Sequence, residues 1–571
     1  MTKNVFPLVL SFLLYCLAYT QVTPKGQQQI DSIFSEWNTN EKPGMAAGLI
    51  YGDDIRYTMA YGLADIENGH PNTTQTKFQV DHLSRQFTVL AVLLLEKQGK
   101  LSLQDPVSKY VAELPDFKKP LLISHLVNHS SGLNDYEVVK GLLGIREDHV
   151  FTHEDALRLI YNQKEPNFTP GTDFSYITSK TELTLLAEIV KKVSSQSLDE
   201  FAQKNIFGPL QMKHSLFCED YQQIISEKAH SYHTPENGFK RKVLNQGHAG
   251  PTNLYTSAED LLKWYANFMA KPSDELTELI QKLDTPVTLD NGNTYDSAWG
   301  RMTLGRSFFH KERGEPAYWQ YGLVGGYGAN VFRFPEQRLI SFVLGNNDSY
   351  NGYPAMMHAN HYIEDKYPEP NVVEIPKSKT RKPTLDYYKK IEGHYWNAKR
   401  GLARRIYVSN DSLFYARVGQ EQGLPLIPLD KNKFQLQVES DDKIYFNFSE
   451  ENGQQTYEAI SGGSSPSKYV KYVPTEYSER QLQEFTGDFY EPNLACVYRF
   501  NIKEGILYAQ SPTGRIIELS PVIQDTFRSN VWSLASVVYQ RDINGTITGF
   551  KINTDGLQNL EFIKIKPKAD S

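Results

Sequence analysis

The chain has 571 residues, of which 40% are apolar and 22% are charged, and its formal net charge is −7. This length is too great for one hydrophobic core, so we expect several domains. The composition excludes a disordered chain, and an acidic balance without a basic tract excludes nucleic acid as a partner.

Residues 1–20, MTKNVFPLVLSFLLYCLAYT, have the pattern of a secretory signal peptide. Lys3 supplies the positive start, and the apolar run that follows has about 13 residues, too few to span a bilayer. Lipidation at Cys16 is an alternative, although Tyr15 is a poor neighbour for it. We therefore expect a secreted or periplasmic protein without an integral membrane span. Only Cys218 and Cys496 remain after cleavage, and two distant cysteines make no disulfide framework.

The elements of the first 370 residues are expected to alternate. Patterning predicts helices at 27–37, 78–100, 152–162, 179–193, 197–207 and 257–269. It predicts strands at 45–51, 55–61 and 339–344, within a strand-rich block at 299–346. The glycines from Gly322 to Gly328 are interpreted as a turn between strands rather than a phosphate loop. A helical middle flanked by strands from both ends predicts a layered α/β domain.

The stretch FQVDHLSRQFTVLAVLLLEKQGK, residues 78–100, is central to this domain. Val89 to Leu95 is apolar all the way round, which predicts a helix buried on every side. Its first turn is polar and carries His82, Ser84 and Arg85, so we expect that turn to form the floor of a cleft. Ser84 lies two residues, about 200° of helix rotation, past His82 and should face away from the cleft.

A proline-bearing, basic segment at 372–384, VVEIPKSKTRKPT, predicts a linker. Beyond it, short β-runs repeat at offsets of 92 to 94 residues, as in Gly393 and Gly487 or Phe434 and Phe527. Two copies of about 90 residues suit two small antiparallel barrels. The expected organisation is a signal peptide at 1–20, a domain at 21–371, a linker at 372–384 and barrel modules at 385–473 and 474–569.

Several blocks in residues 21–365 resemble the serine β-lactamase and penicillin-binding protein superfamily, in its class C, esterase and D-aminopeptidase branch. The blocks, in order, are residues 78–111, ISHLVNHSSGLNDY, PGTDFSYITSKTELTLLAEIV, IFGPLQMKHSLF, LYTSAEDLLKW and YGLVGGYGANVFRFPEQRLISFVLGNND. The resemblance implies an antiparallel sheet with a helical domain. The two following modules resemble the lipocalin-like barrels of D-aminopeptidase relatives.

The family chemistry that this resemblance implies is acyl transfer to the serine of a Ser-x-x-Lys motif, with a Tyr-x-Asn motif, a His or Lys on a facing strand and an oxyanion hole of backbone amides. This sequence departs from that pattern. His82 occupies the serine position and Arg85 the lysine position. Tyr176 is kept, Thr178 replaces the asparagine, and Gln320, or Leu323 with a shifted gap, replaces the strand cation. Arg85 cannot act as a base because a guanidinium stays protonated.

Two functions remain open from the sequence. The first is a pseudoenzyme that binds a peptide, an ester or an acidic small molecule, with the Arg85 guanidinium binding a carboxylate. In the alternative without a ligand, the site is eroded and Arg85 pairs with a nearby acid such as Asp81. The second is a hydrolase of esters, amides or D-amino-acid peptides that uses His82 and Tyr176. A purely adhesive role of the barrels is a third alternative. No cofactor is expected, and no metal site, because His125 and His129 lack a third ligand.

Overall fold

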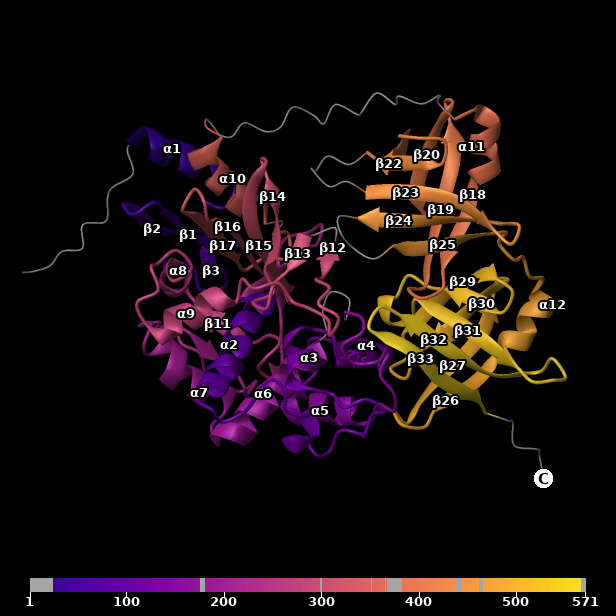
Figure 1. Cartoon of the computed structure of the whole chain (residues 1–571), viewed down its shortest axis with the longest axis horizontal. Coiled ribbons are helices and arrows are strands. Elements are labelled where there is room, and N and C mark those ends of the chain that lie inside the picture. Colours follow the sequence, from indigo (N-terminus) through magenta and orange to yellow (C-terminus); the bar gives the residue numbers. More distant parts are fainter. Residues whose placement is uncertain are drawn as a thin grey trace, which may run out of the picture.

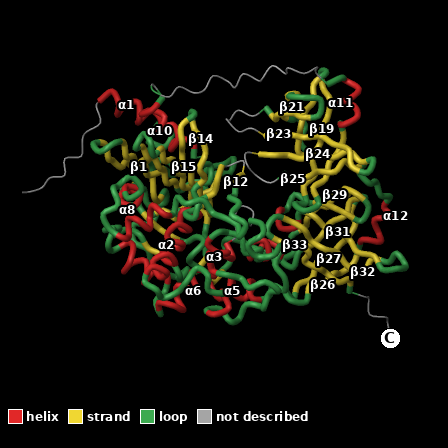
Figure 2. The backbone as a smooth tube through the Cα atoms, viewed as in Figure 1, coloured by secondary structure: helices red, strands yellow, loops and turns green. Residues whose placement is uncertain are grey.

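The computed structural model describes residues 24–174, 180–297, 300–350, 352–364, 366, 383–437, 444–461 and 466–565. A layered α/β domain is followed by two β-barrels, which lie side by side at the right of Figure 1. Figure 2 shows that helices are concentrated in the first domain, whereas the barrels consist mainly of strands. The predicted signal peptide and most of the predicted linker lie outside the described residues, and the predicted domain boundaries stay predictions.

The first domain is built on an eight-stranded antiparallel sheet in the order β12-β13-β14-β15-β16-β17-β1-β2. Its strands are β1 Met45–Tyr51, β2 Ile55–Tyr61, β12 Asp296–Ser297, β13 Gly300–Met302, β14 Phe308–Glu312, β15 Glu315–Val324, β16 Tyr327–Phe334 and β17 Leu339–Gly345. β1 pairs with β17 along its whole length, so strands from both ends of the domain are neighbours in one sheet. α1 (Pro24–Ile33) and α10 (Tyr353–Ile363) contact each other on one face of this sheet.

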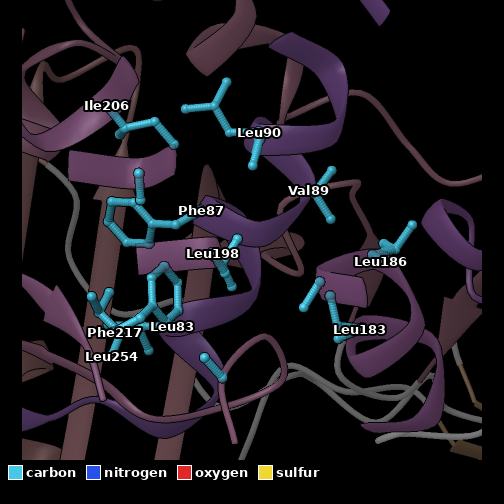
Figure 3. Packing of buried hydrophobic residues seen from close by; sticks show 14 of the residues in the cluster. Leu83, Phe87, Val89, Leu90, Leu183, Leu186, Leu198, Ile206, Phe217 and Leu254 are labelled. Atoms are coloured by element: carbon cyan, nitrogen blue, oxygen red, sulfur yellow. The ribbon is translucent and has the colours of Figure 1, made fainter. Parts of the chain in front are cut away.

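The other face carries the helical layer around α2 (Ser84–Lys97). Every residue from Ser84 to Leu95 is buried, which confirms the predicted all-round burial. Figure 3 shows Phe87 and Leu90 packed beside Ile206, whereas Val89 points toward Leu186 of α6. The further helices are α3 Ile123–Val127, α4 Tyr136–Leu142, α5 His153–Tyr161, α6 Lys180–Ser194, α7 Leu198–Ala202, α8 Ala258–Ala266 and α9 Glu275–Lys282.

Short strands complete the domain: β3 Leu63–Asp65 with β4 His70–Pro71, β5 Phe78–Gln79 with β11 Leu254–Thr256 and β7 Leu216–Phe217, β6 Phe151–Thr152 with β10 Gln246–Gly247, and β8 Ser231–His233 with β9 Lys240–Lys242. Two predicted helices change at their ends. Residues 78–79 form β5 instead of the start of the central helix, and α1 ends at Ile33 rather than residue 37. The helix predicted at 197–207 finishes as a π-helical turn, Gln203–Phe207.

Both C-terminal modules are closed eight-stranded antiparallel barrels, as the repeat predicted. Barrel 1 follows α11 (Leu385–Ile391) and contains β18 Gly393–Asn397, β19 Leu402–Ser409, β20 Ser412–Arg417, β21 Leu424–Pro428, β22 Lys433–Leu436, β23 Ile444–Glu451, β24 Gln454–Ser461 and β25 Ser467–Tyr472. Barrel 2 follows α12 (Glu479–Leu482) and contains β26 Gly487–Glu491, β27 Cys496–Lys503, β28 Ile506–Gln510, β29 Ile516–Ile523, β30 Thr526–Arg528, β31 Ser536–Arg541, β32 Ile547–Thr554 and β33 Leu557–Lys564.

Barrel 2 is docked on α4 of the first domain (Figure 1). Val138, Val139 and Leu142 of α4 belong to the same buried apolar cluster as the interior of barrel 2. The Tyr498 hydroxyl donates a hydrogen bond to the Leu142 carbonyl at 2.7 Å. The β32–β33 turn also reaches the domain, since the Asp135 N–H donates to the Gly556 carbonyl at 2.8 Å. This interface places the end of barrel 2 beside the loop that precedes α4.

None of the helices within the described ranges is both long and apolar enough to cross a membrane.

Candidate active site

The candidate site is formed where β5 passes into α2 through a short 3₁₀ turn, Asp81–Leu83. The predicted first turn of the central helix is therefore this 3₁₀ turn, and the α-helix begins one residue later, at Ser84. Asp81 has a φ of 42°, in the left-handed region that favours glycine and, among other residues, Asn and Asp. Ser84 is directed elsewhere, as predicted, because its hydroxyl accepts a hydrogen bond from the Leu254 N–H at 3.3 Å.

His82 is the most accessible member of the turn, with 27% of its side chain exposed. Its Nε2 lies 3.3 Å from Oδ2 of Asp81. Desolvation, followed by the positive charges of Arg85, Lys180 and Arg306, holds the pKa of His82 well below its ordinary value. The imidazole is therefore neutral near pH 7 and is a weak base.

Arg85 has no exposed surface. Its Nε donates a long hydrogen bond of 3.4 Å to the Pro251 carbonyl, and its Nη1 and Nη2 have no hydrogen-bond partner among the residues that the structure describes. No ion pair within 4.0 Å joins Arg85 to Asp81, in contrast to the alternative considered from the sequence. Burial lowers the pKa of Arg85, whereas Asp81 and Asp135 raise it.

The strand that faces this turn is β15, and Gly322 allows the two backbones to meet. A Cβ at Gly322 would lie 2.6 Å from the Val80 carbonyl oxygen and 3.0 Å from the His82 nitrogen. Gly322 is therefore a strand residue at a close approach and not part of the predicted turn, which Gly325 and Gly326 form with positive φ. The next residue, Leu323, donates its N–H to Oδ2 of Asp81 at 3.0 Å. The Asp81 carboxylate thus accepts the hydrogen bond of the Leu323 N–H, the strand amide that lies beside the His82 backbone.

Not all of the other predicted site residues lie at the turn that carries His82. Gln320 lies on β15, but its Oε1 accepts from the Tyr265 hydroxyl and its Nε2 donates to the Gly305 carbonyl, at 2.9 and 2.7 Å. Its amide is therefore engaged in the core. Leu323, the alternative at that position, is 41% exposed. Tyr176 and Thr178 lie outside the described residues.

Lys180, at the first position of α6, is a site residue that the sequence motifs did not identify. Its Nζ lies 3.7 Å from Oε1 of Glu137, which also accepts a hydrogen bond from Lys140 at 3.4 Å. Burial alone would lower the pKa of Lys180, but Glu137 and Asp81 outweigh it and raise the pKa. A lysine in the first turn opposes the helix dipole, which was the available signal that this residue has an acidic partner.

Buried acids balance these cations. Asp135 caps α4 by accepting the Glu137 N–H at 3.0 Å, and burial raises its pKa to about 6. Glu182 of α6 accepts from the Ser131 hydroxyl at 2.5 Å and lies 2.7 Å from Nδ1 of His129. The loop at residues 129–133 is thereby fixed to α6.

Within the described parts of the chain, no group of three metal-ligating side chains (His, Cys, Asp or Glu) lies at this site. His125 and His129 point to different carboxylates, of Asp290 and Glu182. A group of three, Asp65, Glu67 and His230, has ligand atoms within 4.8 Å of one another elsewhere in the first domain. Arg241 donates to Nε2 of His230 at 3.2 Å, which places a cation in that group already.

Within the described turn from Asp81 to Arg85, no hydroxyl, thiol or amine is hydrogen-bonded to a base. Nucleophilic catalysis needs a hydroxyl, thiol or amine beside a base that accepts its proton. Lys180 stays protonated, Arg85 is a permanent cation, and the Ser84 hydroxyl faces Leu254. His82 therefore remains the one accessible reactive group of the turn.

Comparisons with known proteins agree with this fold. A family described as Beta-lactamase matches residues 30–362. The chain is 25% identical over 366 residues to a D-aminopeptidase of Gluconobacter oxydans, covering 64% of this chain and 65% of that protein, so it spans less than two thirds of this relative. It is 26% identical over 410 residues to penicillin-binding protein 4* of Bacillus subtilis, covering 68% of this chain and 86% of that protein.

Among solved structures, the octameric penicillin-binding protein homologue from Pyrococcus abyssi aligns with a TM-score of 0.52 at 24% identity, over 78% of this chain and 99% of that one. This likeness shows a common fold. Because the family match extends over more than half of the sequence, the chain belongs to the beta-lactamase family.

Proposed function

We propose that this chain is an exported, non-covalent binding member of its family rather than an acyl-transfer enzyme. The single observation that carries the proposal is the hydrogen bond from the Leu323 N–H to the Asp81 carboxylate at 3.0 Å. Acyl transfer needs backbone amides that are free to receive a developing oxyanion. Here the strand amide is already occupied by a carboxyl group of the chain itself.

The charges around His82 support the same proposal. The turn pairs a neutral imidazole with a permanent cation, and neither can remove a proton from a hydroxyl efficiently. The signal-like segment at residues 1–20 supports export.

The ligand that we propose is a peptide or small molecule that ends in a carboxylate. Arg85 carries two nitrogens without a partner among the described residues, and the Ser130 hydroxyl, also buried, is unpartnered as well. A carboxylate accepts two parallel N–H bonds from a guanidinium. It would therefore satisfy the buried cation better than a neutral group.

The proposal is tested with the purified chain, a fluorescent penicillin and a fluorophosphonate ester probe. We expect no covalent label, and we expect N-acetyl-D-alanyl-D-alanine to bind at least tenfold more tightly than its C-terminal amide in calorimetry. The variant Arg85→Gln should lose this preference, whereas Arg338→Gln, which alters a surface pair with Asp53, should keep it. Stoichiometric labelling would remove the proposal.

Hydrolysis is the second candidate, because His82 is partly exposed and lies 3.3 Å from a carboxylate that could orient it. The relatives named D-aminopeptidase favour D-amino-acid peptides among the substrates considered from the sequence, which also include esters and amides. Turnover of p-nitrophenyl acetate or D-alanine amide that is lost in His82→Ala would support hydrolysis over binding alone.

A further inference from the structure

The two barrels are copies of one module, but they carry different side chains at matching interior positions. The strand registers align them: Gly393 pairs with Ile406 as Gly487 pairs with Phe500, which places Arg404 of barrel 1 at the position of Tyr498 in barrel 2. The same comparison places Tyr457 and Tyr469, which pair with each other, at the positions of Phe550 and Phe562.

Barrel 2 shows what folding alone requires at these positions. Phe550 and Phe562 are stacked at 4.6 Å in a buried apolar interior. The one polar side chain of the set, Tyr498, finds an acceptor, because its hydroxyl donates to the Leu142 carbonyl at the end of α4. The hydroxyl of Tyr539, another buried residue of this interior, donates to the Phe485 carbonyl at 3.2 Å. An apolar interior whose buried tyrosine hydroxyls have acceptors is therefore sufficient to close this module.

Barrel 1 has a cluster of hydrogen-bond donors in the same place. Nε of Arg404 donates to the Tyr415 hydroxyl at 2.7 Å, and Nη1 donates to the Ala403 carbonyl at 2.9 Å. Tyr457 has no exposed surface, and its hydroxyl has no partner among the described residues. No carboxylate of the described chain forms an ion pair with Arg404. The cluster thus combines one cation with two tyrosine hydroxyls, and no described residue accepts a hydrogen bond from the Tyr457 hydroxyl.

Burying such a cluster costs free energy unless an anion accepts its hydrogen bonds. A buried hydroxyl without a partner, and a partly buried cation without a counter-ion, both lose hydration without compensation. An oxyanion is the group that accepts from a guanidinium and from two hydroxyls at once. Arg404 and Tyr415 are only half-buried, so an anion from solution can reach them.

The surroundings specify the rest of the ligand. Leu402, Ile444 and Ala459 are partly buried apolar residues of the same barrel core. Leu402 begins β19, Ile444 begins β23, and both lie at the same end of the barrel as Arg404. We infer that this end of barrel 1 binds a carboxylic acid with an aliphatic portion, whose carboxylate accepts from Arg404, Tyr415 and Tyr457. This site is independent of the function proposed for the first domain.

The test uses the full chain and three probes: octanoate below its micelle concentration, acetate and octanol. In calorimetry, octanoate should bind saturably with one site per chain, acetate at least tenfold more weakly, and octanol without saturation. Octanoate should also raise the thermal midpoint. Saturable binding of octanol would show that the carboxylate charge is not recognised. Equal affinities for acetate and octanoate would show that the aliphatic chain is not recognised. Either result overturns the inference.

Two variants install the residues of barrel 2, which the module is known to accommodate: Arg404→Tyr and Tyr457→Phe. Each should weaken octanoate binding at least tenfold. Tyr457→Phe should leave the ligand-free chain as stable or more stable, because it removes an unpaired hydroxyl. The matched control is Arg405→Tyr, since the Arg405 guanidinium stacks on Tyr407 at 4.4 Å rather than on the interior tyrosines. Absence of saturable octanoate binding, or unchanged binding in Arg404→Tyr, would overturn the inference.

Discussion

The Asp81 carboxylate accepts the backbone N–H of Leu323 at 3.0 Å, so a side chain from the start of the helix closes the amide of the facing strand. Asp81 has a φ of 42°, in the left-handed region, and its side chain reaches β15 through this hydrogen bond. Burial raises the pKa of this carboxyl, and the hydrogen bond from Leu323 partly offsets that cost. The Leu323 amide is therefore blocked by the side chain of a single residue, Asp81.

This relationship predicts how acylation could be restored. The triple variant His82→Ser, Arg85→Lys and Thr178→Asn restores the family residues but leaves Asp81 on the Leu323 amide. Adding Asp81→Gly frees that amide, and glycine adopts a positive φ without strain. We expect the quadruple variant to form an acyl adduct with a fluorescent penicillin on the order of 10²-fold faster than the triple variant, the usual effect of one oxyanion donor.

The measurement is the rate of adduct formation by mass spectrometry, with Asp81→Gly alone as the control that should stay unlabelled. Equal rates for the triple and quadruple variants would show that Asp81 does not limit the site. An absence of adduct in both would show that the walls of the site no longer accept the substrate.

The sequence predicted the residues of the helix turn better than their surroundings. The resemblance singled out His82 and Arg85, whose catalytic roles stay predictions, whereas helix spacing predicted that Ser84 faces away from them, and its hydroxyl accepts from the Leu254 N–H. The contact between Asp81 and Leu323 joins residues that are 242 positions apart in the chain. It depends on the register of β15 against the helix start, which no local pattern specifies. Gln320 was found on the predicted strand, yet its amide turns to Tyr265 for the same reason.

For the fold as well, local patterns were predictable from the sequence, whereas contacts between distant segments were not. Period-two patterns and the internal repeat were sufficient for β1, β2 and the two barrels, because each strand pairs mainly with its neighbour. The docking of α4 in barrel 2 was not predicted. Val138, Val139 and Leu142 look like an ordinary helix face in sequence, and nothing in that pattern indicates that the face is covered by a distant module.

Asp135 should make stability depend on pH. Its folded pKa is about 6, above the ordinary 3.8, so the folded chain binds this proton more tightly than the unfolded chain does. Ionisation therefore costs the folded state up to about 3 kcal/mol, absent below pH 4 and complete above pH 6. Asp135→Asn keeps an oxygen for the Glu137 N–H, so its thermal midpoint should exceed that of the wild type at pH 8 and converge with it near pH 4. A difference independent of pH would contradict this assignment.

Leu142 should couple the first domain to barrel 2. Its side chain is fully buried within the barrel 2 cluster, and Leu142→Ala should lower the free energy of unfolding by about 2–5 kcal/mol. Separate melting of the two parts in calorimetry should accompany this loss. Leu143→Ala is the matched control, because Leu143 is only partly buried at the edge of the same cluster. Similar destabilisation by both variants would contradict a specific role of Leu142.

Gly322 should be required for the contact between β15 and the start of the helix. In Gly322→Ala, the new methyl group would lie 2.6 Å from the Val80 carbonyl oxygen and 3.0 Å from the His82 nitrogen, and these backbone atoms cannot rotate away. Overpacking of this kind costs about 1–3 kcal/mol, so the thermal midpoint should fall. The displacement should also separate the Leu323 N–H from Asp81, which hydrogen exchange at Leu323 would detect as faster exchange.

Leu323→Ala, the adjacent and 41% exposed position, is the control and should change the midpoint little. An unchanged midpoint and unchanged exchange in Gly322→Ala would show that the strand can move without loss, and that the closure by Asp81 does not depend on this close approach.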